Sequence, residues 1–79
     1  MVSDILLALS REKPVGIEVW SISGTVYVYV PGKNGSREVG SCDFFSIKEL
    51  KSGLVRMGYS ETKAEINAPG EYVYTYSRG

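Results

Sequence analysis

The stretch Thr25–Val30, with the sequence TVYVYV, alternates valine and tyrosine without a break. Because successive side chains of a β-strand point to opposite faces of a sheet, this strand has one valine face and one face that carries Tyr27 and Tyr29. The valine face is suited to line a hydrophobic core. The tyrosine face needs another explanation: a core, a neighbouring subunit or a target.

The segment before this strand continues the same pattern. Residues 15–22 predict a strand in which Ile17 and Val19 share one face, while Glu18 and Trp20 share the other. A Ser-Gly pair separates the two strands and predicts a tight turn. We therefore expect the aliphatic residues of both strands to lie under the helices, on one side of a sheet.

The segment after this strand predicts a second hairpin. Residues 31–36, PGKNGS, are turn formers with an Asn-Gly pair, and a third strand follows over about 37–44. The same glycine-rich segment lacks the spacing of a phosphate-binding loop and is not followed directly by a helix. Three strands joined by short turns predict an antiparallel meander.

Helices are predicted on both sides of the meander. Ser3 is a candidate N-cap for a helix over about Asp4–Glu12, which Pro14 stops. The second helix follows the meander, within residues 47–58, and carries apolar residues at helical spacing.

The second helix has start and stop signals of its own. Ser46 and Glu49 predict a capping box, with Phe45 as a hydrophobic staple, and Gly58 predicts the C-terminal cap. Gly53, inside this helix, costs about 1 kcal/mol relative to alanine. We expect it to mark a close contact or to be merely tolerated.

A last hairpin follows the second helix. Residues 61–67 and 71–77 predict two strands around a Pro-Gly turn. The element order is then αβββαββ, which predicts an α+β fold: one antiparallel sheet with two short helices packed on one face. The length predicts a single domain over residues 1–79.

Composition restricts the possible partners. Nine basic and nine acidic side chains give a net charge of zero, which disfavours binding driven by phosphate neutralisation. No apolar run reaches membrane-spanning length, so we expect no membrane partner. The single cysteine, Cys42, allows no intramolecular disulfide, and this predicts a cytoplasmic protein.

Catalytic groups are scarce in this sequence. The chain has no histidine, which removes the commonest general base and metal ligand. Asp43 beside Cys42 would raise the pKa of the thiol rather than activate it. The carboxylates form no spaced ligand cluster. We expect neither an enzyme, nor a metal site, nor a cofactor.

Aromatic side chains carry the functional prediction instead. Tyrosine and tryptophan are enriched at protein interfaces because they bury a large area at low entropic cost. We predict a contact patch at Trp20, Tyr27 and Tyr29, with Glu18 beside them. A secondary aromatic patch is predicted on the last strand, at Tyr72, Tyr74 and Tyr76. Cross-strand packing is the structural alternative for all of these rings, and the two rows could pack on each other within one sheet.

Part of the chain resembles a known family. The resemblance rests on the alternation of the first two strands, on the aromatic Trp20, on the pattern VG..DF.S over residues 39–46, and on Leu50 and Ser52. In these residues the segment 15–54 resembles small phage anti-CRISPR proteins that inhibit the type I-F surveillance complex.

The resemblance implies a stoichiometric inhibitor in the host bacterial cytoplasm. Such a protein binds backbone subunits of a type I CRISPR effector complex and blocks target DNA binding. The tail departs from the family, in which it is polar and helical. Of the family's interface positions only the aromatic at Trp20 is kept, because Pro31 and Leu6 replace an acidic and an aromatic residue. The resemblance therefore implies the class of molecule and not its footprint.

Three functions are carried forward. The first is a non-catalytic protein-binding domain, with the double variant Tyr27→Ala, Tyr29→Ala expected to fold but not to bind. The second is a single-stranded nucleic-acid-binding domain that stacks bases on its tyrosines. The third is a self-associating structural subunit that pairs through residues 71–77 at a sheet edge. The oligomeric state is correspondingly a monomer or a homodimer.

Overall fold

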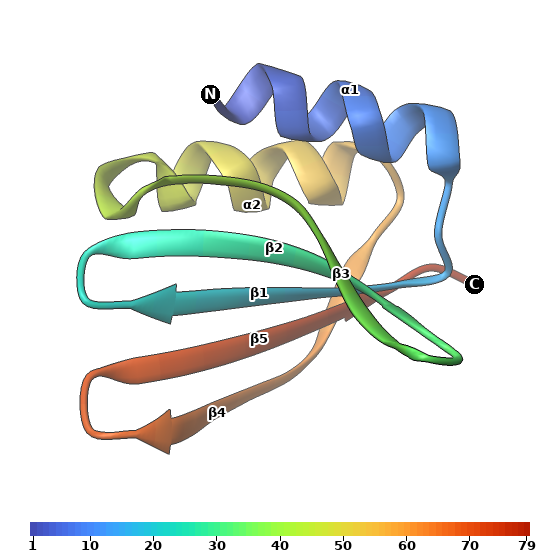
Figure 1. Ribbon diagram of the computed structural model, residues 1–79. Coiled ribbons are helices and arrows are strands. Elements are labelled where there is room, and N and C mark those ends of the chain that lie inside the picture. Colours follow the sequence, from blue (N-terminus) through green and yellow to red (C-terminus); the bar gives the residue numbers. More distant parts are fainter.

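Two helices cover one face of a five-stranded antiparallel sheet in the computed structural model, which describes residues 1–79 (Figure 1). The α+β fold and the predicted element order are confirmed. The helices are α1 (Val2–Glu12) and α2 (Ile47–Arg56), and a 3₁₀ turn, Phe44–Ser46, precedes α2. The strands are β1 (Gly16–Ile22), β2 (Thr25–Gly32), β3 (Gly35–Asp43), β4 (Ser60–Ala68) and β5 (Glu71–Ser77).

The strand order is β3-β2-β1-β5-β4, so the first strand lies at the centre of the sheet. The last strand inserts between β1 and β4 and pairs with both of them. The predicted self-association through β5 at a sheet edge is therefore wrong, because both edges of β5 are already paired. β4 and β3 are the edge strands instead.

Short turns set the register of the hairpins. Ser23 and Gly24 both have positive φ, 49° and 84°, which is the geometry of the two-residue turn that suits twisted strands. The next hairpin is tighter than predicted: β2 and β3 stay paired to Gly32 and Gly35, which leaves only two residues in the turn.

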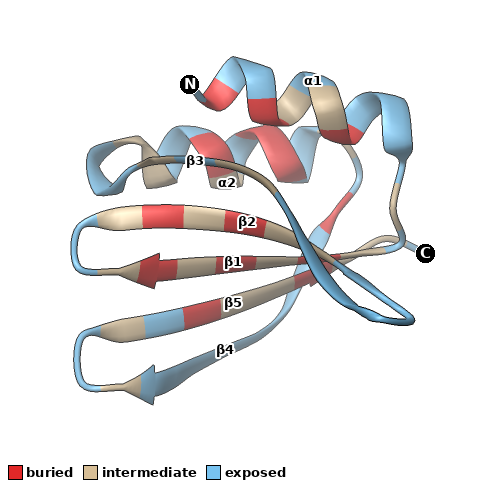
Figure 2. Ribbon diagram, in the orientation of Figure 1, coloured by how far each residue is buried: buried red, intermediate tan, exposed pale blue.

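The hydrophobic core lies between the sheet and the helices. Ile17, Val19, Val26 and Val28 are all fully buried there, as predicted from their alternation. Figure 2 shows this core as buried positions that recur along β1, β2 and the inner sides of both helices, whereas β4 is exposed over nearly all of its length. The helices contribute the remaining aliphatic core residues: Val2, Ile5, Leu9, Leu50 and Leu54.

The two helices approach each other closely at Gly53. A β-carbon at this position would lie 2.4 Å from Leu6 Cδ1, a distance that real contacts do not show. Gly40 of β3 plays the same part under α1, since a β-carbon there would lie 2.8 Å from Ile5 Cγ1. Of the two explanations that the sequence left open for Gly53, the structure shows the close contact.

The helix starts differ from the prediction. α1 begins at Val2, so Ser3 lies inside its first turn and makes no capping hydrogen bond. The predicted capping box is also wrong. Residues 44–46 form a 3₁₀ turn, which gives Ser46 a φ of −92° and a ψ of 3° instead of the extended backbone of a capping residue. Phe45 is 96% exposed, so it does not form the predicted hydrophobic staple.

The end of α2 follows the prediction. Gly58 has a φ of 96°, and the amide groups of Gly58 and Tyr59 donate to the carbonyl groups of Val55 and Leu54. This is the two-bond pattern that closes a helix with a left-handed glycine. Neither helix is long and apolar enough to span a bilayer.

Candidate protein-binding face

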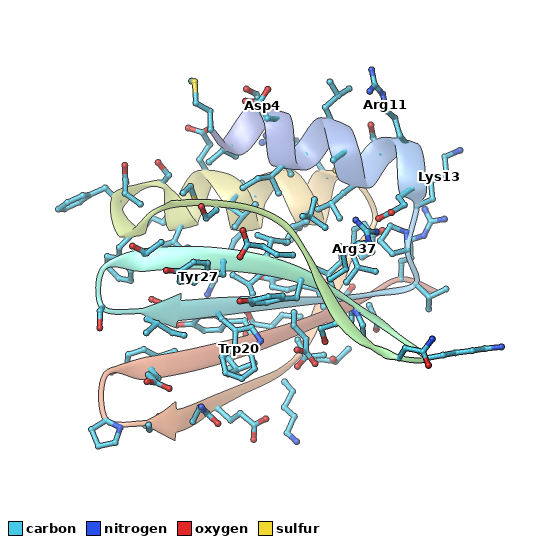
Figure 3. All side chains as sticks on the ribbon, in the orientation of Figure 1. Asp4, Arg11, Lys13, Trp20, Tyr27 and Arg37 are labelled. Carbon is cyan, nitrogen blue, oxygen red and sulfur yellow. The ribbon has the colours of Figure 1, made fainter.

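The register of the sheet brings the four predicted contact residues together. Glu18 lies opposite Tyr29, and Trp20 lies opposite Tyr27, on the side of the sheet that the helices leave uncovered. Figure 3 shows Trp20 and Tyr27 on this side, with α1 and α2 beyond the opposite side. We name the surface around these four side chains the aromatic face.

The rings of the aromatic face hold one another in place. Trp20 and Tyr29 meet edge to face, with centroids 6.3 Å apart, and Tyr27 stacks on Tyr29 at 6.5 Å. Trp20 Nε1 donates a hydrogen bond of 3.1 Å to Glu18 Oε1. All four side chains are half-buried, so the face is an ordered surface and not a set of free rings.

Val73 supports the aromatic face from β5. It lies directly opposite Trp20 and is only 6% exposed, although no helix covers it. The sequence did not reveal this role, because the pairing of β5 with β1 is a long-range contact. A valine between tyrosines on the last strand was the only signal available.

A shallow hollow opens beside Trp20. Its lining consists of Glu18, Trp20, Ile22, Tyr29 and Ser36. Two aromatic rings and one carboxylate therefore meet at one depression of the face. This combination suits a ligand group that is both flat or apolar and positively charged.

Acidic side chains dominate this side of the sheet. The strand pairing places four carboxylates on the same side of the sheet as the aromatic residues, and Lys63 is the one base among them. Lys63 Nζ already lies 3.6 Å from Glu65 Oε1. The four carboxylates belong to Glu18, Glu38, Glu65 and Glu71. The Asp43 carboxylate instead accepts a hydrogen bond from Ser46, just before α2.

The zero net charge therefore conceals an uneven distribution. On the two helices the bases outnumber the acids, with Arg11, Lys48, Lys51 and Arg56 against Asp4, Glu12 and Glu49. Figure 3 shows Asp4 and Arg11 on the side of α1 that points away from the sheet. The net charge of the sequence did not predict this separation, because the separation depends on which strand faces are exposed.

The second predicted patch is not a surface patch. Tyr72, Tyr74 and Tyr76 lie on the helix side of the sheet, opposite to the aromatic face. Tyr76 is 2% exposed and belongs to the core, Tyr74 is half-buried, and only Tyr72, at 41%, is exposed. The two tyrosine rows cannot pack on each other, because the sheet separates them.

A charged cluster fixes Tyr74 and Tyr76 against α2. Lys51 Nζ lies 3.4 Å from the centroid of the Tyr74 ring and 3.7 Å from Glu61 Oε1. The Tyr76 hydroxyl donates a hydrogen bond of 3.1 Å to the same carboxylate. Burial raises the pKa of Tyr76, and the hydrogen bond and the charge of Glu61 raise it further.

This cluster predicts a loss of stability at alkaline pH. The pKa of Tyr76 is higher in the folded than in the unfolded chain, so its contribution is complete below about pH 10 and is lost as the pH rises further. We expect the free energy of unfolding, measured with urea, to fall less steeply above pH 10 in Tyr76→Phe than in the wild type. At neutral pH the variant should lose about 1 kcal/mol, the value of its hydrogen bond.

Tyr72→Phe is the matched control, since it removes the hydroxyl of an exposed ring on the same strand. It should follow the wild-type pH profile. Equal slopes for Tyr76→Phe and the wild type would show that Tyr76 does not stabilise the fold in this way.

The remaining reactive groups are consistent with packing roles. Cys42 is half-buried, and burial, followed by the charge of Asp43, raises the pKa of its thiol, so the thiolate is disfavoured. The Tyr59 hydroxyl donates to the Pro14 carbonyl oxygen at 2.6 Å. No three potential metal ligands gather anywhere in the structure.

Comparison with protein-family models, with curated proteins and with solved structures finds no match for this chain.

Proposed function

We propose that this protein is a non-catalytic protein-binding domain that docks on its target through the aromatic face. The observation that carries the proposal is the fixed arrangement of Trp20, Tyr27 and Tyr29 on a sheet face without a covering layer. Polar-tipped rings that are already ordered lose little entropy on binding. A preformed sheet face also docks without a large rearrangement.

The charges support a protein target over a nucleic acid. A stacking platform for single strands combines its aromatic rings with a positively charged groove. Here the rings share their face with four carboxylates and one ion-paired lysine. Phosphates would meet repulsion on this surface.

The resemblance described above supports a specific form of this proposal. We propose that the target belongs to a type I CRISPR effector complex, that binding blocks its access to DNA, and that the protein acts in the cytoplasm of a phage-infected bacterium. Trp20, the interface position kept in the resemblance, lies at the centre of the aromatic face.

The double variant Tyr27→Thr, Tyr29→Thr tests the face. Threonine keeps the β-propensity of both positions while it removes the rings. With purified type I-F surveillance complex, we expect the wild type to co-elute and to abolish the shift of target DNA, and the double variant to bind at least tenfold more weakly. Circular dichroism should show both proteins folded.

The matched control is Leu7→Thr with Val55→Thr, two exposed apolar residues of the helix layer. It should behave as the wild type. If the wild type does not bind the complex, the anti-CRISPR assignment is wrong. Capture from a host lysate then tests the face alone: proteins retained equally by the wild type and by the Tyr27, Tyr29 variant would exclude it as the docking surface.

A further inference from the structure

The other side of the sheet shows how this chain holds a cation. There the ammonium group of Lys51 lies over the Tyr74 ring and beside the Glu61 carboxylate. An aromatic face attracts a cation through its quadrupole, and a carboxylate adds a direct charge interaction. This cation site therefore consists of three parts: an aromatic ring, a carboxylate and the cation that both attract.

The hollow on the aromatic face has aromatic rings and a carboxylate, but no cation. Glu18 provides the carboxylate, and Trp20 and Tyr29 provide two rings at an interplanar angle of 81°. Glu18 makes no ion pair with any base of the chain: its one side-chain hydrogen bond comes from Trp20 Nε1 to Oε1. No base of this chain therefore occupies the position that Lys51 occupies on the other side of the sheet.

We propose that this hollow takes an arginine side chain from a basic segment of the protein partner. The inference rests on the proposed function and names the chemistry of its target. A guanidinium group is planar, so it can lie flat on one ring while its N–H groups reach Glu18. The surrounding carboxylates, which include Glu38 and Glu71, favour a partner whose flanking residues are also basic.

The single tryptophan of the chain allows a direct test. Because Trp20 lines the hollow, its fluorescence responds when this site is occupied. The probe is a capped peptide in which arginine alternates with glycine and serine. The control peptide carries citrulline, the neutral isostere, at every arginine position. We expect saturable quenching by the arginine peptide, at least fivefold tighter than any response to the citrulline peptide.

The variant Glu18→Gln keeps an oxygen that can accept from Trp20 Nε1 but removes the charge. It should bind the arginine peptide at least fivefold more weakly than the wild type. Glu49→Gln, which removes one carboxylate from α2 in the helix layer, should bind as the wild type does. The inference is overturned if arginine and citrulline peptides quench alike, if Glu18→Gln binds as tightly as the wild type, or if no quenching occurs.

The outcome is separable from that of the proposed function. A target that needs Tyr27 and Tyr29 but binds Glu18→Gln normally would overturn the arginine site and leave the docking face in place. Specific arginine binding without any protein target would retain the site and reject the proposed function.

Discussion

The variant Leu54→Ala is expected to lose about 3 to 4 kcal/mol of its free energy of unfolding. Leu54 of α2 is fully buried between the helix layer and the sheet. Truncation removes its transfer free energy and leaves a cavity that the surrounding strands cannot fill. A domain of this length has roughly 4 to 12 kcal/mol in total. The loss should therefore bring the protein close to unfolding, as measured by urea denaturation followed by circular dichroism.

Val55→Ala is the control for this prediction. Val55 is the next residue on the same helix but is 60% exposed. Its truncation should change the free energy of unfolding by no more than about 0.5 kcal/mol. Similar losses for the two variants would contradict the placement of α2 on the sheet.

Gly53→Val is expected to destabilise the protein by about 1 to 3 kcal/mol. The β-carbon alone would overlap the end of the Leu6 side chain, since it lies 2.4 Å from Cδ1 and 2.9 Å from Cδ2. Either the Leu6 side chain must move aside or the helices must separate, and overpacking of this kind costs about 1 to 3 kcal/mol. Valine recovers part of the helix propensity that glycine lacks, but this gain is only a few tenths of a kcal/mol.

A second substitution, at Leu6, tests the steric explanation. In a Leu6→Ala background, Gly53→Val should cost less than half as much, because the obstructing side chain is gone. Ser52→Val, at an exposed position of the same helix, should be nearly neutral, since serine and valine have similar helix propensities. Equal costs of Gly53→Val with and without Leu6 would disprove the steric explanation.

The sequence predicted the parts of the fold that depend on local rules. Strict alternation placed Ile17 and Val19 in the core, and turn chemistry placed the first hairpin at Ser23-Gly24. Both follow from the geometry of neighbouring residues. The same alternation placed Trp20, Tyr27 and Tyr29 on one surface, because only adjacent strands with a short turn had to be aligned.

The sequence did not predict features that depend on distant pairing. In β5 three tyrosines alternate with Glu71, Val73, Thr75 and Ser77, and alternation alone did not show whether the tyrosine side faces the core or the solvent. Tyr76 entered the core because β5 pairs with β1 in the register that places Ile17 opposite Tyr76. The same register placed Val73 under the aromatic face. The capping box failed for a local reason, because the 3₁₀ turn had already set the backbone at Ser46.

The central position of β1 has a consequence for the order of folding. β1 meets β2 across a turn of two residues, but it meets β5 only when Ile22 is brought against Glu71 from the far part of the chain. The entropy of closing that long loop delays the second pairing relative to the first. While β1, β2 and β3 are paired and β5 is not, Trp20 would lack the support of Val73. The surface proposed to recognise the target would be completed by the strand that arrives late, so a partially folded chain would not yet be competent to bind.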